Sequence, residues 1–304
     1  MQSNGQDTTG APHRGQRNPP PDPQPRRPAY PVPARSWDCH IHLFGPSARF
    51  PFAPESPYIS DDALPEQYFA NQKVLGLERA VVVSAGGYGT DCAHLRWVLE
   101  AHGERLRGII LPRADLSPGE MGELDRLGVR GVRMFGAPVG HEWDHLPRID
   151  TRIAAMAGEL GWHVQYHSVT RDDIEHAAGR LLAMPCRVVL DHFGMFDPRL
   201  GLDQAGFKAI LRMLDSGRVW IKLSGPMRAA REEEFPYPSM TAYARALVEH
   251  APERMLWGSD WPHVQMNGRI MPNDGDLLGL LAEWAPDDSV RARILAENPV
   301  PLYD

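Results

Sequence analysis

Short β-branched runs alternate with helix-length segments along most of the chain, and this alternation restricts the fold more than any other feature. Neighbouring parallel strands need crossover connections, usually helices, so the pattern predicts a parallel α/β sheet. Eight strand–helix units favour a closed, TIM-like (β/α)8 barrel, with a doubly wound open sheet as the alternative. No Gly-X-Gly-X-X-Gly follows an early strand, which removes the commonest cofactor signal of the open sheet. The predicted strands cover residues 37–43, 79–84, 106–111, 129–134, 162–167, 187–190, 219–223 and 255–257, and the predicted helices include 65–76, 93–102, 118–127, 152–160, 171–183, 204–214 and 240–250.

The first 36 residues form a proline-rich polar segment with almost no apolar run. Such a segment buries too little apolar surface to offset its ordering entropy. We therefore expect a disordered tail over residues 1–36 and one catalytic barrel over residues 37–304. On that basis, deletion of residues 1–35 is expected to leave activity and thermal stability almost unchanged. The pair Arg26-Arg27 has no apolar segment after it, so an export signal is not expected.

The charge and cysteine content narrow the choice of partners. A net charge of -7 argues against a nucleic-acid partner, whereas single arginines in a pocket could still hold a small anionic molecule. The chain has three cysteines, Cys39, Cys92 and Cys186, and no Cys-X-X-Cys motif. An odd number of widely spaced cysteines is typical of reduced thiols in a cytoplasmic protein. No apolar run is long enough for a membrane span. We expect a cytoplasmic protein with neither a membrane nor a nucleic-acid partner; its oligomeric state stays open, with a homo-oligomer as one alternative.

Polar residues gather where the predicted strands end. His40 and His42 lie two residues apart in a strand, so both imidazoles point to one face, although an isolated pair of this kind is about as often a chance occurrence. A lone histidine at a strand end is more often a hydrogen-bonded core residue. In a barrel, however, the strand ends form one face, and convergence of several such residues favours a site. The further strand-end residues are Arg133, His167, Asp191, His192, Lys222, Ser224, Arg228, Asp260 and His263.

These residues can support hydrolysis with a metal ion. His40, His42, His167 and Asp260 are donors of the kind zinc accepts. A divalent ion held there would lower the pKa of a bound water to about 7 and supply hydroxide. His192 would then orient or protonate the substrate.

The same residues can also support hydrolysis without a metal. Asp260 is then the candidate general base, and His192, Arg133 or Arg228 the candidate oxyanion stabiliser. Arg133 lies in an apolar strand, so its charge needs a buried anion: either a protein carboxylate or a substrate carboxylate. Arg228 has the same two interpretations. Tyr58 could reach the barrel mouth or simply pack.

Four longer motifs stand at the ends of predicted strands. They are Asp-Cys-His-Ile-His-Leu-Phe-Gly-Pro at 38–46, Gly-Val-Arg-Gly-Val-Arg at 128–133, Leu-Asp-His-Phe-Gly at 190–194 and Trp-Gly-Ser-Asp-Trp-Pro-His at 257–263. Together these motifs resemble the amidohydrolase superfamily, and within it the branch that contains 2-pyrone-4,6-dicarboxylate lactonase. The resemblance covers about residues 37–303 and implies a (β/α)8 barrel whose members hydrolyse lactones from aromatic or sugar-acid degradation.

The resemblance also implies roles for individual residues. By this pattern Asp260 is the general base, and His40, His42 and His192 bind or polarise the scissile carbonyl. The implied substrate-binding residues are Arg133, Arg228, Tyr58 and His167.

Three positions depart from the pattern of this branch. Gly86 stands where a serine is expected, residues 135–139 hold no second arginine, and His167 replaces a tyrosine. The predicted anion-binding set is therefore thinner. Because His167 adds a donor, the sequence slightly favours one divalent ion, zinc foremost, over a metal-free site.

The leading hypothesis is a hydrolase that opens a small carboxylated lactone, 2-pyrone-dicarboxylate-like or a related lactone from aromatic or sugar-acid catabolism. Water would attack with the help of Asp260. The alternative is a metal-dependent decarboxylase of an aromatic or unsaturated carboxylic acid on the same barrel. A barrel that only binds a metabolite is the third and weakest interpretation.

Overall fold

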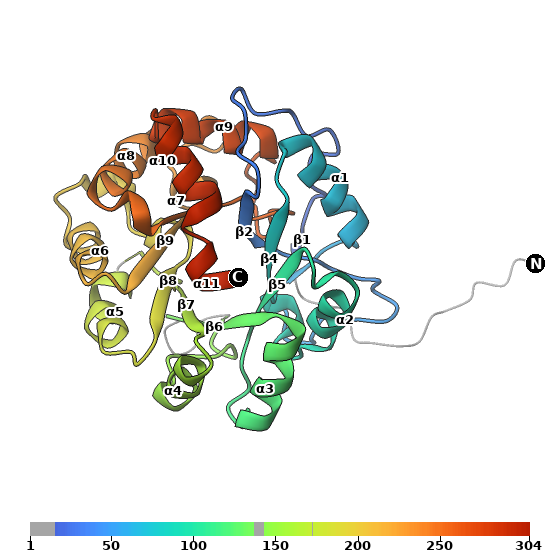
Figure 1. Ribbon diagram of the computed structural model, residues 1–304. Helices are drawn as coiled ribbons and strands as arrows, with labels where there is room; N and C mark the ends of the chain where they lie inside the picture. Colours follow the sequence, from blue (N-terminus) through green and yellow to red (C-terminus); the bar gives the residue numbers. More distant parts are fainter. Residues whose placement is uncertain (1–15, 137–142, 172) are drawn as a thin grey trace, which may run out of the picture.

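Eight parallel strands form a barrel that helices surround (Figure 1). The computed structural model describes residues 16–136, 143–171 and 173–304. Hydrogen-bonded neighbours in the sheet follow chain order, so every crossover runs to the adjacent strand. The strands are β2 (Trp37–Ile41), β4 (Arg79–Val83), β5 (Leu106–Ile110), β6 (Val129–Phe135), β7 (His163–His167), β8 (Arg187–Leu190), β9 (Val219–Ser224) and β10 (Met255–Gly258).

The first and last strands meet and close the barrel. Ile41 forms a parallel bridge with Trp261. The backbone N–H of His42 donates to the Trp261 carbonyl at 2.7 Å, and that of Asp260 donates to the His40 carbonyl at 2.8 Å. The predicted (β/α)8 barrel is confirmed and the open sheet is excluded. All eight predicted strands are confirmed to within two residues at either end.

Capping signals in the sequence set both boundaries of the helix at 118–127. The helix at Pro118–Leu127 begins after Ser117, whose hydroxyl accepts from the backbone N–H of Glu120 while the Glu120 side chain accepts from Ser117. It ends at Gly128, whose φ of 102° suits glycine. The helices are α1 (Pro65–Leu75), α2 (Ala93–His102), α3 (Pro118–Leu127), α4 (Thr151–Glu159), α5 (Asp173–Leu182), α6 (Ala205–Asp215), α7 (Pro226–Ala229), α8 (Thr241–His250), α9 (Asp274–Trp284), α10 (Asp288–Ala292) and α11 (Val300–Tyr303).

Residues 16–36, here called the N-terminal strap, pack along the barrel. β1 (Gln16–Arg17) pairs in parallel with β3 (Tyr58–Ile59). The next residue, Asn18, is buried; its backbone N–H donates to the Ile59 carbonyl at 2.9 Å, and its side-chain oxygen accepts from the backbone N–H of Gln265 at 2.7 Å. The strap therefore joins two loops at the mouth of the barrel.

Further along, the strap follows helix α9. The backbone N–H of Arg26 donates to the side chain of Asn273, the N-cap of α9, and the Tyr30 hydroxyl donates to the Leu278 carbonyl at 3.0 Å. The predicted disorder thus does not extend over residues 16–36; the rest of that prediction falls on residues 1–15, outside the described residues. The reason is that polar groups of α9 and of the loops hold the strap, while Tyr30 and Val32 pack against the apolar core.

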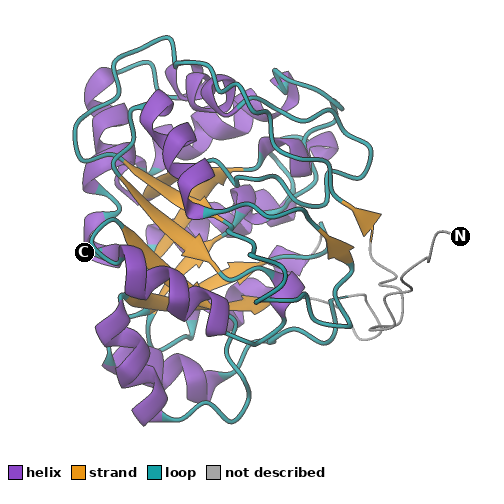
Figure 2. Cartoon of the chain, turned by 90° about the vertical axis from the view of Figure 1, so that its right-hand side faces the viewer, coloured by secondary structure: helices purple, strands orange, loops and turns teal. Residues whose placement is uncertain are grey.

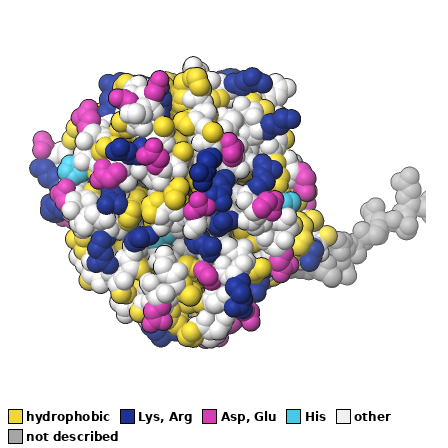
Figure 3. Space-filling view, viewed as in Figure 1, with side chains coloured by type: hydrophobic (Ala, Val, Ile, Leu, Met, Phe, Trp, Pro, Cys, Tyr) yellow, Lys and Arg dark blue, Asp and Glu magenta, His cyan; other side chains and the backbone are white. Residues whose placement is uncertain are grey.

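Helix α11 covers the end of the barrel where the strands begin, in front of the barrel in Figure 1. Arg107 donates to the Tyr303 carbonyl at 2.9 Å, Arg187 bonds the Pro301 carbonyl, and Arg79 pairs with Asp304. On this face basic and acidic side chains are interspersed (Figure 3). The strands run from this end toward the β1–β3 pair (Figure 2), so the site lies opposite. Within the described residues no helix is long and apolar enough to cross a membrane.

Candidate active site

A β-bulge in β2 aims the first histidine into the barrel. The pairing of β2 with β4 shifts register between Asp38 and Ile41. Cys39 belongs to the apolar cluster inside the barrel, yet the next residue, His40, also points inward. An extra residue in a strand re-aims the side chains that follow it, which is common beside active sites. His42 follows two residues later, and both rings face the same carboxylate, as the spacing predicts.

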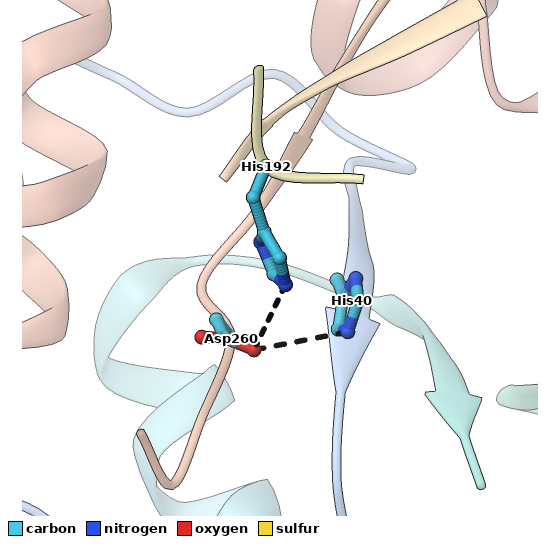
Figure 4. Close-up of side chains that lie close together, drawn as sticks. All are labelled: His40, His192 and Asp260. Carbon is cyan, nitrogen blue, oxygen red and sulfur yellow. Dashed lines mark ion pairs between the residues drawn. The ribbon is translucent and has the colours of Figure 1, made fainter. Parts of the chain in front are cut away.

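That carboxylate belongs to Asp260, directly after β10. Its Oδ1 atom lies 3.7 Å from Nε2 of His40, 3.6 Å from Nε2 of His42 and 3.9 Å from Nε2 of His192. Figure 4 shows two of these rings, His40 and His192, directed at it. The other oxygen, Oδ2, accepts from Nε of Arg228 at 2.7 Å. All four predicted catalytic residues thus come together, and the arginine fixes the carboxylate plane.

A second buried carboxylate, Asp191, approaches the other ring nitrogen of His40. Nε of Arg133 donates to its Oδ2 at 2.8 Å, the Gln165 amide donates to the same atom at 3.1 Å, and His40 Nδ1 lies 3.2 Å from Oδ1. Nζ of Lys222 is 3.7 Å from Oδ1, and burial lowers the pKa of this lysine to about 8. The sequence places Asp191 at a strand end without indicating its role, and Gln165 is not among the predicted site residues. Gln165 lies two residues before His167 at the end of β7, so both side chains point to the same face of the strand. This spacing is the signal that could have identified Gln165.

Buried charges compensate one another in this site. Burial opposes ionisation of Asp260 and Asp191, but the neighbouring Arg228 and Arg133 hold the pKa of each carboxyl well below its usual value. Burial, together with the neighbouring Lys222 charge, lowers the pKa of His40 to about 3 against the opposing effect of Asp191 and Asp260. At neutral pH the two carboxylates are therefore ionised and this imidazole is neutral.

The site has unpartnered atoms that fit a cation. Nδ1 of His42 lies 2.8 Å from the Val83 carbonyl, which can only accept, so Nδ1 donates and Nε2 is directed at Asp260. Nδ1 of His40 lies 3.2 Å from Asp191 Oδ1 and 3.4 Å from Nζ of Lys222, and its Nε2 has no hydrogen-bond partner among the described residues. Nε2 of both rings faces Asp260 Oδ1, which also has no hydrogen-bond partner in the described part of the chain. Three electron-rich atoms around one point suit a divalent ion.

His167 lies outside this group of donors. Its Nδ1 atom is 3.2 Å from Nη2 of Arg133, and its possible ligand group is formed with Asp191 and His192. Burial holds the pKa of His167 well below its usual value, so the ring is neutral. Of the four predicted metal ligands, His40, His42 and Asp260 lie close together, whereas His167 faces the second carboxylate. Among the described residues around Asp260, the set whose ligand atoms all lie within 4.8 Å of one another is His40, His192 and Asp260, so His192 takes the place of a predicted ligand.

A small inner cavity of about 30 Å³ adjoins these groups, enough for a water molecule or two but not for a lactone ring. Every predicted substrate-binding residue lines it. They are Tyr58, Arg133, His167 and Arg228, together with His42 and His192.

The departure at Gly86 has a steric counterpart. A Cβ on Gly86 would lie 2.3 Å from the ring of Trp143, so no side chain fits there with the indole in place. Trp143 also lines the inner cavity, and nothing in the sequence pattern singled it out. The Trp143 ring therefore occupies the space beside Gly86, the position at which the related branch has a serine.

Residues 37–304, which include every element of the barrel, match the family model described as amidohydrolase. The chain belongs to the amidohydrolase family. It is 36% identical over 276 residues to a 4-sulfomuconolactone hydrolase of Rhizobium radiobacter, covering 90% of this chain and 92% of the relative. It is 35% identical over 288 residues to a 2-pyrone-4,6-dicarboxylate hydrolase of Comamonas testosteroni, covering 92% and 93%. A solved apo structure from Agrobacterium tumefaciens superimposes with a TM-score of 0.80 at 26% identity, covering 91% and 98%.

Proposed function

We propose that this chain is a hydrolase that opens a small carboxylated lactone. The observation that carries the proposal is the unpartnered Oδ1 of an ionised Asp260, which faces three imidazole nitrogens beside a cavity large enough for water. The names of the two relatives, which are lactone hydrolases at 35% and 36% identity, support the same reaction class.

In the proposed reaction Asp260 is the general base. Its Oδ1 takes a proton from water as the water oxygen bonds to the lactone carbonyl carbon. His192 and Arg228 lie beside the developing oxyanion and stabilise its charge. The ring C–O bond then breaks, and the departing oxygen takes the proton back from Asp260. Lactone and water thus give one open-chain hydroxy acid or its keto tautomer, with no net proton transferred to the enzyme.

His40, His192 and Asp260, whose ligand atoms lie within 4.8 Å of one another, are the residues that would hold a divalent ion, with His42 beside them. Such an ion would supply Lewis acidity beside the reacting carbonyl. Asp191 and Lys222 would keep the ring of His40 oriented through its Nδ1 atom, and the Val83 carbonyl would do the same for His42.

We expect about one divalent ion per chain in the purified protein, since buried lone pairs around an ionised oxygen are costly without a cation. Elemental analysis before and after dialysis against a chelator measures the content, and activity is followed in parallel. The variant His42→Gln should hold less metal than the native chain. A content far below one per chain, with activity that a chelator leaves unchanged, would contradict the expectation and support water activation by Asp260 alone.

Arg133 is expected to hold the substrate carboxylate through the N–H groups that its bonds to Asp191 and His167 leave over. Arg133→Met should lower kcat/KM for a carboxylated lactone by about 10- to 100-fold, the loss of one charged hydrogen bond of roughly 1.5–3 kcal/mol. An uncharged lactone should barely be affected. Steady-state kinetics on both substrates measures the difference.

Arg130→Met is the matched control, because Arg130 lies on the same strand but bonds Asp125 outside the cavity. Equal losses on charged and uncharged lactones would assign Arg133 a structural role. Arg228→Met should instead lower kcat on both substrates, since Arg228 orients Asp260.

The proposal as a whole is tested by a panel of lactones with and without carboxylate or sulfonate groups. Ring opening is followed by ultraviolet absorbance and product mass. We expect a mass gain of one water on at least one anionic lactone. Release of carbon dioxide from an aromatic or unsaturated acid, with no lactone opened, would favour the decarboxylase instead.

A further inference from the structure

The side chain of Asp38 joins the first and last strands of the barrel. Asp38 lies in β2 and is completely buried. Its Oδ1 atom accepts from the backbone N–H of Ser259 at 2.9 Å and from that of His40 at 3.2 Å. Ser259 follows β10 and directly precedes Asp260. One carboxylate oxygen therefore holds the backbone of the two segments that carry His40 and Asp260.

The other oxygen of Asp38 strengthens the same connection. Oδ2 accepts from the Ser259 hydroxyl at 2.6 Å and from the Tyr68 hydroxyl at 3.2 Å. Oγ of Ser259 in turn accepts from the backbone N–H of Trp261 at 3.0 Å. The carboxylate thus holds Ser259 by its backbone and by its side chain. Within the described residues neither Asp38 nor Ser259 lines the inner cavity, so both act through their neighbours.

The join between the two strands is tightly packed beside the site. A Cβ on Gly258 would lie 2.7 Å from the Cβ of His40, so only glycine fits there with the histidine in place. Asp260 has a φ of 69°, a left-handed conformation that is uncommon for a residue with a side chain. A displacement of Ser259 would therefore change the 3.7 Å separation between Oδ1 of Asp260 and Nε2 of His40 (Figure 4).

We infer that Asp38 is a positioning residue for the proposed reaction. Its hydrogen bonds to the backbone of His40 and of Ser259 set the position of the His40 ring relative to the Asp260 carboxylate. The inference rests on the proposed function and deepens it, because it names a residue outside the cavity on which the rate depends. Asp38 and Ser259 belong to two of the strand-end motifs, and the proposed reaction gives neither of them another role.

The test compares Asp38→Asn, Ser259→Ala and the double variant by steady-state kinetics on a lactone that the native chain opens. Misplacement by about 1 Å typically costs about 100-fold, so we expect kcat to fall about 100-fold in Asp38→Asn and about tenfold in Ser259→Ala. KM should stay within about twofold of the native value, because only an interaction made in the transition state is weakened. The double variant should be no slower than Asp38→Asn, since the two residues act as one unit.

Asn298→Ala is the matched control. Asn298 is buried, and its Nδ2 donates to the Pro252 and Met255 carbonyls at 2.7 and 2.8 Å. Met255 begins β10, the strand that Asp260 follows, so the control removes buried hydrogen bonds from the other end of the same strand. All variants are assayed well below their melting temperatures. Asn298→Ala should keep the native kcat although it lowers the melting temperature.

A second readout needs no substrate. Heteronuclear NMR of protein with nitrogen-labelled histidine follows the ring nitrogens of His40, whose signals are assigned by their loss in His40→Gln. Ser259→Ala changes no charge, so a shift of these signals reports a change in geometry. We expect the shift in Ser259→Ala and not in Asn298→Ala. A native chain that opens no lactone would refute the proposed function, whereas this shift would still support the positioning role.

Four results would overturn the inference. They are a native kcat in folded Asp38→Asn, losses that multiply in the double variant, an equal loss of kcat in Asn298→Ala, and unchanged His40 signals in Ser259→Ala. If Asp38→Asn does not fold, Ser259→Ala decides alone. A lowered kcat together with shifted His40 signals then supports the inference, and a native value of either one overturns it.

Discussion

Asp260→Asn will lower kcat on the native lactone by about 10³-fold or more. The amide oxygen cannot take a proton from water, and the loss of a positioned general base typically costs 10²–10⁴-fold. The amide also carries no charge to hold a cation. Purified variant and native chain are compared by steady-state kinetics at equal active concentration, and circular dichroism checks the fold.

The variant also leaves the Arg228 guanidinium without its carboxylate, which can lower stability by several kcal/mol. Asp197→Asn is the control: Asp197 is also a buried carboxylate paired with an arginine, Arg199, but outside the inner cavity, and it should keep full activity. If Asp260→Asn does not fold, Asp260→Glu keeps the charge and displaces the carboxylate, and should cost about 10²-fold. Near-native turnover in a folded Asp260→Asn variant would remove Asp260 from the mechanism.

A chain that begins at residue 36 will melt about 10 °C lower than one that begins at residue 16. The strap supplies a strand pair and hydrogen bonds to Gln265, Asn273 and Leu278, and their loss is expected to cost roughly 5 kcal/mol. It also holds the segments that carry Tyr58 and Gln265 in the cavity wall, so kcat/KM should fall as well. Thermal melting and kinetics of the two chains measure both effects.

The single variant Asn18→Ala tests the contact between the strap and the loop that carries Gln265. It leaves the backbone N–H of Gln265 without its partner while the rest of the strap stays in place. We expect a loss of about 1–3 kcal/mol and a raised KM. Equal melting temperatures and equal kcat/KM for the chains beginning at residues 16 and 36 would show that the strap is dispensable, as its composition alone suggests.

The barrel could be predicted because its signal is repeated. Each strand is a short β-branched run, and the eight runs with helix-length spacers admit few topologies, so local uncertainty at any one run mattered little. The strand-end histidines and Asp260 could be placed for the same reason: the fold brings the carboxyl ends of all eight strands to one face. What remained open was which of those residues contact one another.

Features that depend on single tertiary contacts could not be predicted in this way. The order of the strap depends on Asn18 and Asn273, two polar side chains with no periodic pattern around them. The steric exclusion between Gly86 and Trp143 joins loops far apart in the sequence, and the pairing of Arg133 with Asp191 depends on strand register. Helix α9, apolar on several faces, was not among the predicted helices, because a helix covered on both sides lacks a polar stripe.

The opposite placement of α11 and the strap determines how the protein can be attached to a support. Asp304 lies at the closed end of the barrel, away from the cavity, whereas Asn18 lies in the wall of the mouth. Immobilisation through a linker after Asp304 would orient every molecule with its cavity toward the solution. A linker joined at the strap would crowd the entrance and strain the loop that carries Gln265.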